Sequence, residues 1–200
     1  MIKIAVLVSG GGTNLQALID AQNSGILHSG KISLVVSNTR GAYALERAAK
    51  AGIPTETILK KECGSQAAFE EKLSQVLESK GIQLIILAGF MTILTASFTS
   101  RYPRRILNVH PALIPSFCGE GYYGLRVHEA ALQYGVKVTG ATVHFVNEIP
   151  DGGEIIAQKA VDVLPGDTPE ILQRRVMEQA EWVLLPRAAE EVSASMSGGI

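Results

Sequence analysis

The sequence predicts an α/β protein with a Rossmann-like three-layer fold, whose sheet is mostly parallel with an antiparallel C-terminal portion. Through the first half of the chain, apolar runs rich in β-branched residues alternate with segments of helical period and short loops. This alternation is typical of a parallel sheet with helices on both faces. In the second half, two strand-like runs follow each other closely enough to pair antiparallel.

Each element of the first half follows from a local pattern. Ile2–Val8 is apolar apart from Lys3 and stops at a glycine-rich turn, as expected of a strand buried on both faces. The helix after the turn is expected to have Asn14 as its N-cap, with Leu15 and Leu18 on its apolar side. The alternation then continues with strand 32–37, helix 42–51, strand 55–59, helix 66–79 and strand 84–88.

The second half starts with a short strand and then loses its period. The expected elements are strand 106–109, an aperiodic stretch rich in proline and glycine over 110–124, helix 127–134, strands 140–146 and 154–163 joined by 147–153, and helix 168–192. Thr168 before Pro169 is a typical helix start. Residues 1–192 are expected to form a single domain and 193–200 a flexible C-terminal tail.

The composition narrows the classes of function. The 200 residues include Lys+Arg 18 and Asp+Glu 19, a net charge of −1, which gives no basic footprint for nucleic acid. Cys63 and Cys118 lack the spacing of a disulfide framework or a zinc site. No signal peptide is recognised, and the longest apolar stretch, 84–91, is too short to span a bilayer. We therefore expect a cytoplasmic protein that uses no metal, nucleic acid or membrane.

The turn 9–14 joins the first strand to the first helix, so its backbone N–H groups and the helix N-terminus can bind an anion such as a phosphate. The alternative is a tight turn that only reverses the chain. A Walker A motif is excluded because no Gly-Lys-Ser/Thr follows. Gly10 and Gly12 fit the dinucleotide fingerprint, but Leu15 replaces its third glycine, and 37–40 lacks an acidic residue for a ribose. A mononucleotide-like phosphate therefore fits better than NAD.

A second candidate site is at the end of strand 106–109, on the edge where open α/β sheets bind ligands. Alternation puts Asn108 and His110 on the same side of the strand. A carboxamide beside an imidazole can stabilise an oxyanion or handle a proton, and a histidine with a structural role is the alternative. Asp151, in the connection 147–153, either belongs to an ordinary Asp-Gly turn or reaches an imidazole and raises its pKa.

The other three histidines have weaker signals. His144 alternates with Thr142 within its strand, which favours a hydrogen-bonded sheet residue. His28 is expected in a solvated turn. His128, near the start of a helix, is open to a structural or a ligand-binding role.

Four motifs in chain order resemble the folate-dependent formyltransferases. They are residues 4–16 (IAVLVSGGGTNLQ), 87–91 (LAGFM), 107–115 (LNVHPALIP), and 143–146 (VHFV) followed by 151–153 (DGG). The resemblance covers essentially the whole chain and is to the members that act in de novo purine synthesis. It implies the formyltransferase fold, and transfer of the formyl group of 10-formyltetrahydrofolate, as co-substrate, to the amine of glycinamide ribonucleotide.

The resemblance also assigns roles to residues. Asn108, His110 and Asp151 match the family's catalytic residues. Attack of an amine on a formyl carbon builds a tetrahedral oxyanion, which needs hydrogen-bond donors. Asn108 would donate an N–H, His110 as imidazolium would be a second donor and an acid, and Asp151 would favour the charged imidazole. No metal or covalent nucleophile is required.

Further positions match the family's two substrate-binding segments. The residues expected to bind the ribonucleotide are Gly12, Thr13, Asn14, Pro111 and Glu181. Those expected to bind the folate are Gln66, Met91, Thr92, Ile93, Leu94, Asn108 and Val146. The chain departs from some relatives at three places: Gln66 and Thr92 replace arginines near the folate, loop 117–124 is longer, and the spacing from Arg175 to Pro186 is one residue longer.

Alternative functions come from two sources. An NADP-binding oxidoreductase or nucleotide sensor, in which Arg40 contacts a 2′-phosphate, is the competing hypothesis from another class. Within the family, a methionyl-tRNA formyltransferase core and a formyltetrahydrofolate hydrolase are the siblings, expected to carry an additional C-terminal or N-terminal domain. The expected partners are small-molecule substrates, and the protein is expected to be a monomer or a homodimer.

Overall fold

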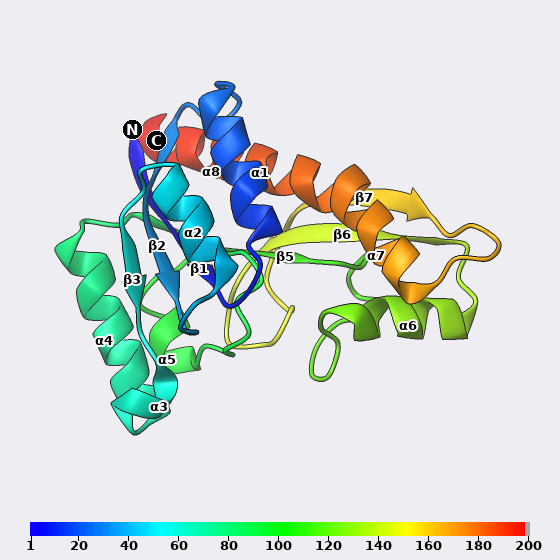
Figure 1. Ribbon diagram of the computed structural model, residues 1–200, viewed down its shortest axis with the longest axis horizontal. Coiled ribbons are helices and arrows are strands. Elements are labelled where there is room, and N and C mark those ends of the chain that lie inside the picture. Colours follow the sequence, from blue (N-terminus) through cyan, green and yellow to red (C-terminus); the bar gives the residue numbers. More distant parts are fainter. Residues whose placement is uncertain (199–200) are drawn as a thin grey trace.

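The computed structural model describes residues 1–198, which form helices around one seven-stranded sheet (Figure 1). The strands are β1 Ile2–Val8, β2 Gly30–Ser37, β3 Thr55–Thr57, β4 Leu84–Leu87, β5 Ile106–His110, β6 Val138–Phe145 and β7 Ile155–Asp162. Their order in the sheet is β3-β2-β1-β4-β5-β6-β7. The first five strands are parallel, while β6 pairs antiparallel with both β5 and β7. The predicted fold class is confirmed.

Helices cover both faces of the sheet. They are α1 Thr13–Asn23, α2 Tyr43–Lys50, α3 Lys60–Cys63, α4 Gln66–Ser79, α5 Ala96–Thr99, α6 Leu125–Tyr134, α7 Pro169–Val176 and α8 Trp182–Gly198, with a π-helical turn Met177–Glu181 between the last two. Along β1, Ile4 and Val6 pack in the core formed with α1, α2 and α8, whereas Leu7 packs in the core formed with α4 and α5. Burying each such side chain contributes roughly 1.5–3 kcal/mol, so β1 anchors both layers.

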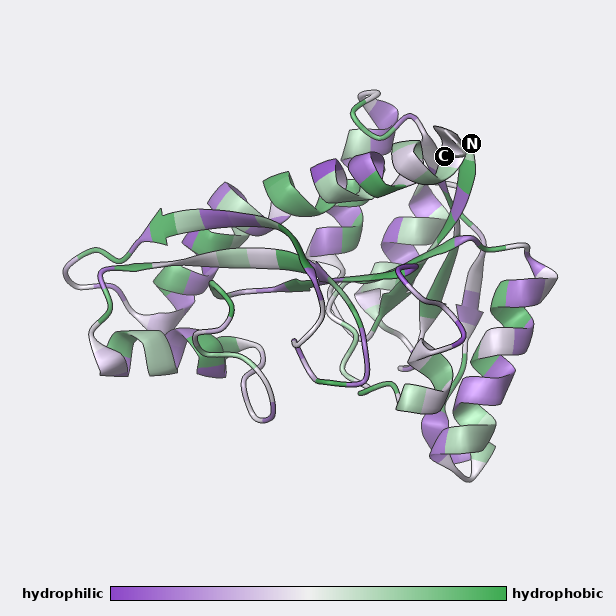
Figure 2. Ribbon diagram, turned by 180° about the vertical axis from the view of Figure 1, so that it is seen from behind, coloured by the Kyte–Doolittle hydropathy of each residue, from purple (hydrophilic) through white to green (hydrophobic). Residues whose placement is uncertain are grey.

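Hydropathy follows these layers. The central strands are mostly hydrophobic, whereas α4 carries hydrophilic and hydrophobic residues on different sides (Figure 2). Strands β6 and β7 extend the sheet away from its parallel part, and α6 and α7 lie beside this extension (Figure 1). Within residues 1–198, no helix is both long enough and apolar enough to cross a membrane.

The start of α1 differs from the prediction. The N-cap is Gly12, in a left-handed conformation with φ 72°, and no side chain caps the helix. Asn14 is already inside the helix, and its side chain bonds to a distant residue, Glu181. The prediction of Asn14 as N-cap was wrong because Gly12, the last residue of the glycine turn, occupies the N-cap position.

The C-terminal helix also differs. The structure divides the predicted helix 168–192 into α7, the π turn and α8, although Thr168 caps α7 as predicted and accepts a hydrogen bond from Ile171 N. The tail predicted over 193–200 is helical as far as Gly198, because Ser193 is completely buried and holds this part of α8 on the sheet. The last two residues of that predicted tail, 199–200, lie outside the described residues.

Candidate active site

The carboxyl ends of β1, β4 and β5 lie at one edge of the sheet, and the strand order changes direction between β1 and β4. Open α/β sheets bind ligands at such a point. The loops after β1 and β4 are joined there, since Ser9 N donates to Gly89 O at 3.1 Å and Met91 N donates to Ser9 Oγ at 2.8 Å. The two loops therefore form one connected rim.

The glycine turn after β1 is supported from α2. A Cβ added to Gly12 would lie 2.6 Å from the Cβ of Ala44, so both its space and its positive φ require glycine. Ala44 N donates to Gly10 O at 3.0 Å, and Arg47 Nε donates to Gly11 O at 2.9 Å. These bonds fix the turn that leads into the α1 N-terminus, where backbone N–H groups favour an anion.

Asn14 and Glu181 form a buried pair beside this turn. Asn14 Nδ2 donates to Glu181 Oε2 at 2.7 Å, and both residues are buried. Burial raises the pKa of Glu181, while the bond from Asn14 acts in the opposite direction. Glu181 is the last residue of the π turn, which takes up one more residue than an α-helical turn.

Three predicted residues, Asn108, His110 and Asp151, come together next to β5. Val109 packs in the core under α1 and α8, so Asn108 and His110 face the opposite side of the sheet. Asp151 reaches them from the β6–β7 connection with φ 54°, a left-handed conformation that Asp tolerates better than most residues. Its Oδ2 lies 3.5 Å from His110 Nδ1, and its Oδ1 accepts from Asn108 Nδ2 at 3.5 Å.

His144 completes the cluster, from the position directly opposite Asn108 in β6. Its Nδ1 donates to Phe145 O at 2.8 Å, which leaves the Nε2 lone pair free to accept from Asn108 Nδ2 at 3.2 Å. The same Nε2 lies 3.6 Å from Asp151 Oδ1. His144 thus fixes the orientation of the Asn108 amide, so this sheet residue also supports the site.

The loop 116–124 is bonded to the same side chains. His110 Nε2 donates to Phe117 O at 2.8 Å, and Gly119 N donates to Asp151 Oδ2 at 2.9 Å. Burial favours the protonated form of Asp151, but its contacts with His144, His110 and Gly119 N outweigh burial and hold the pKa of Asp151 below its usual range. The carboxylate is therefore the stable form at neutral pH.

The pKa of His110 is set mainly by burial. Burial lowers the pKa of this imidazole below its ordinary value, although Asp151 and the Phe117 carbonyl act to raise it. The expectation of an imidazolium with a raised pKa was wrong for this conformation. The charge of Asp151 acts in the predicted direction, but it does not offset the desolvation of a ring that is only 4% exposed.

Comparison with known proteins identifies the family. Residues 2–188 match the family described as Formyl transferase. The chain belongs to this formyltransferase family. A phosphoribosylglycinamide formyltransferase of Haemophilus influenzae is 44% identical to it over 93% of the chain and 84% of that protein. The crystal structure of a glycinamide ribonucleotide transformylase 1 from Symbiobacterium toebii has a TM-score of 0.91 and 41% identity, covering 98% of this chain and 89% of the other.

Some relatives of this formyltransferase are much longer. A trifunctional purine biosynthetic protein adenosine-3 of Gallus gallus is 46% identical over 96% of the chain, but the chain spans only 18% of that protein's length. The similarity to it is therefore confined to one part of the relative.

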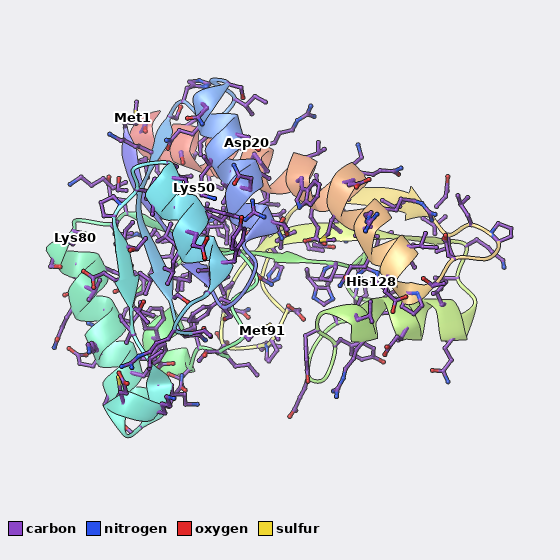
Figure 3. The ribbon with its side chains drawn as sticks, in the orientation of Figure 1. Met1, Asp20, Lys50, Lys80, Met91 and His128 are labelled. Carbon is purple, nitrogen blue, oxygen red and sulfur yellow. The ribbon has the colours of Figure 1, made fainter. Side chains whose placement is uncertain are left out.

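In the formyltransferase, the residues expected to bind folate lie in the loop after β4 and near it. Met91 and Ile93 are 57% and 67% exposed, whereas Leu94 is buried, so only its backbone is available. Figure 3 shows Met91 in the loop beyond the end of β4. Thr92 accepts through Oγ1 from Asn38 Nδ2 at 2.8 Å. The side chains of Met91 and Ile93 are therefore the ones left free.

Three other predicted contacts of the formyltransferase are more enclosed. The Gln66 amide on α4 donates to Glu70 Oε1 at 2.6 Å and to Ile93 O at 3.1 Å. Val146 follows β6 and is half-buried against the core of α4 and α5. Pro111 is half-buried directly after β5, next to His110. The Gln66 amide is thus occupied within the protein.

His128 lies on α6 of the formyltransferase, on the side toward α7 (Figure 3). It is completely buried, and neither ring nitrogen has a hydrogen-bond partner among the described residues. Burial, together with the nearby charge of His110, lowers its pKa to about 4. His128 is therefore neutral at physiological pH. Within residues 1–198, no group of His, Cys, Asp or Glu side chains is arranged to hold a metal ion.

Proposed function

We propose that this chain transfers the formyl group of 10-formyltetrahydrofolate to the amine of glycinamide ribonucleotide, a step of de novo purine synthesis. The observation that carries the proposal is the cluster of Asn108, His110 and Asp151, in which the Asp151 carboxylate lies 3.5 Å from both the Asn108 amide nitrogen and the His110 ring. Relatives named for this activity, similar over most of their length, support it.

The first step is attack of the free amine on the formyl carbon. A C–N bond forms, and the carbonyl electron pair moves to oxygen as negative charge. Asn108 Nδ2 donates to this oxyanion by giving up its 3.5 Å contact with Asp151, while its 3.2 Å contact with His144 keeps the amide oriented. A donor whose orientation is already fixed stabilises the developing charge with little reorganisation, here only the loss of one long contact.

The second requirement is a proton route. The attacking nitrogen must lose a proton, and the folate nitrogen must gain one as its C–N bond to the formyl carbon breaks. His110 takes the first proton and returns it to the leaving nitrogen, because its lowered pKa favours the neutral imidazole that can accept. Asp151 then stabilises the imidazolium while it exists. The products are tetrahydrofolate and the formylated ribonucleotide.

For the ribonucleotide, the α1 N-terminus at Gly12 and Thr13 supplies N–H groups to the phosphate. The buried Asn14–Glu181 pair supplies acceptors for ribose hydroxyl groups, since Asn14 Oδ1 has no partner among the described residues. Pro111 forms the wall of the site after β5.

For the folate, the backbone of residues 91–94 recognises the pterin, and the exposed side chains of Met91 and Ile93 provide apolar contact. Asn108 and Val146 line the path toward the reacting carbon. Gln66 and Thr92 remain proposed neighbours of the folate tail, with their polar groups bonded within the protein.

The proposal also covers the domain organisation, the partners and the cellular location of the protein. Residues 1–192 act as a single formyltransferase domain, as a monomer or homodimer in the cytoplasm. Its partners are small-molecule substrates, and it requires no metal, nucleic acid or membrane. The net charge of −1 supports this because a small anionic substrate needs local backbone donors and no basic surface.

The competing dinucleotide hypothesis is not favoured. Leu15 is completely buried in the core, at the position where a dinucleotide site needs a third glycine. Arg40, the proposed ligand of a 2′-phosphate, is paired with Glu62 at 2.6 Å. The Asn108, His110 and Asp151 cluster also has no place in that hypothesis.

The deciding assay supplies 10-formyltetrahydrofolate with and without glycinamide ribonucleotide. We expect consumption of the donor only when both are present. Consumption with water alone would identify a hydrolase, consumption with methionyl-tRNA would identify the tRNA-directed sibling, and no consumption under any condition would refute formyl transfer. Stabilisation by NADP, measured as a raised melting temperature, would instead support the dinucleotide hypothesis.

A further inference from the structure

Segment 91–95 has no regular secondary structure, yet polar contacts from other elements fix its backbone. At its start, Met91 N donates to Ser9 Oγ at 2.8 Å. One residue later, Thr92 Oγ1 accepts from Asn38 Nδ2 at 2.8 Å. The segment is thus tied to the loops after β1 and β2 before α5 begins.

The end of the segment is held by one carboxylate, Glu70 of α4. Thr95 N donates to Glu70 Oε1 at 2.8 Å, and Thr95 Oγ1 donates to Oε2 at 2.5 Å. Gln66, one helical turn earlier, donates both to Glu70 Oε1 at 2.6 Å and to Ile93 O at 3.1 Å. Glu70 therefore fixes Thr95 directly and Ile93 through Gln66.

This carboxylate is in an unusual setting. Glu70 is 5% exposed, and within residues 1–198 no Lys, Arg or His lies at ion-pair distance from it. A buried carboxylate without a cation costs free energy relative to an apolar side chain, even when hydrogen bonds offset much of the cost. The next residue, Glu71, is exposed and paired with Arg101. The helix itself therefore does not explain why an acid is buried at position 70.

We propose that Glu70 is a positioning residue for the formyl donor. By bonding Thr95 and Gln66 it holds the backbone of residues 91–95 in the conformation that receives the folate, while the side chains of Met91 and Ile93 stay exposed. Because Glu70 holds the backbone, the side chains of Met91 and Ile93 are not needed to anchor the segment and remain free to contact a ligand. The inference rests on the proposed formyl transfer.

The test is Glu70→Met, which keeps the length of the side chain but removes both oxygens that accept from Thr95 and Gln66. We expect KM for 10-formyltetrahydrofolate to rise about tenfold, since Thr95 N and Gln66 Nε2 lose their acceptor. We expect kcat and KM for glycinamide ribonucleotide to stay within about twofold, because Asn108 and the glycine turn are untouched. Binding of tetrahydrofolate, measured by titration calorimetry without turnover, should weaken by the same factor.

Two companion variants separate positioning from general stability. Glu71→Met makes the same change at the neighbouring exposed acid and should leave the donor KM unchanged. Thr95→Val keeps the N–H but removes the hydroxyl donor to Glu70, without altering the charge on α4, so it tests the same contact if Glu70→Met fails to fold. It should raise the donor KM by a smaller factor.

The results that overturn the inference are specific. A folded Glu70→Met or Thr95→Val with an unchanged donor KM overturns it, and so does an equal rise in KM for both substrates. Absence of formyl transfer by the unmodified protein would instead refute the proposed function. In that case tetrahydrofolate calorimetry still decides whether Glu70 controls folate binding.

Discussion

Asn14 Nδ2 lies 2.7 Å from Glu181 Oε2, and this single bond joins the first helix to the π turn near the other end of the chain. Both side chains are buried, so if one is removed, bulk water does not take its place as the partner of the other. The pair combines a structural contact with a proposed substrate contact. Stability and binding are therefore expected to change in opposite directions when it is altered.

Glu181→Gln is the variant that separates these two effects. The raised pKa of Glu181 means that its contribution to stability is complete below the ordinary carboxyl pKa and is lost as pH rises through the folded-state pKa. A neutral amide avoids this loss and can still accept from Asn14. We expect the melting temperature at neutral pH to rise by about 2–4 °C, and KM for glycinamide ribonucleotide to increase. A lower melting temperature in thermal unfolding would contradict this reasoning.

Asn108→Ala removes the proposed oxyanion donor. We expect kcat to fall on the order of 100–1000-fold, with little change in the KM values. Steady-state kinetics with both substrates measure this directly. A loss of less than tenfold would refute the oxyanion role.

His144→Ala removes the acceptor that orients the Asn108 amide at 3.2 Å. We expect kcat to fall by about tenfold or more, since the amide is then free to turn away from the oxyanion. His28→Gln is the matched control, because His28 pairs with Glu190 on the exposed surface. Equal losses in the two variants would show that the effect is not specific to the site.

Asp151→Asn tests the coupling to His110. The carboxylate raises the pKa of His110 against the larger effect of burial. Removing its charge should therefore move the His110 titration to lower pH, and the acidic limb of the kcat profile with it. NMR titration of the imidazole Cε1–H resonance measures the shift, and an unmoved titration would contradict the pairing.

His128 should control stability in acid. Its pKa is lowered to about 4, so the folded state holds it neutral, and stability is lost as pH falls from the ordinary histidine pKa through 4. The loss over this window is on the order of 3 kcal/mol. His128→Leu should remove that part of the pH dependence. Urea unfolding at pH 7 and at pH 4 checks it, and parallel pH dependence in the two proteins would be the contrary result.

Hydrophobic patterns in the sequence were sufficient to predict most helices and strands, because they reflect which side chains are buried. Ile2–Val8 and Gln66–Ser79 have the predicted bounds, since a largely apolar run and a long helical period each allow one structure. The short helices α3 and α5 were not predicted, because four residues carry too little period. The π turn was not predicted either, since the segment has the same helical period as α7 and α8 on either side and its contacts with β6 and β7 are tertiary.

The sequence predicted which residues belong to the site, but it did not predict all the hydrogen bonds that join them. Asn108 and His110 could be placed together because they belong to one strand. The bond from Asn108 to His144 depends on the register between β5 and β6, which alternation within a single strand does not specify. The buried state of Glu70 was equally hidden, because the adjacent Glu71 has the same side chain and is exposed.

The docking of loop 116–124 has an experimental consequence. The amide proton of Gly119 is held by the Asp151 carboxylate, a group that itself changes charge with pH. Deuterium uptake at this single amide therefore reports the ionisation of Asp151 without any substrate. Because the pKa of Asp151 is lowered, uptake through loss of this bond is expected only in acid, and at neutral pH the loop stays docked on the carboxylate.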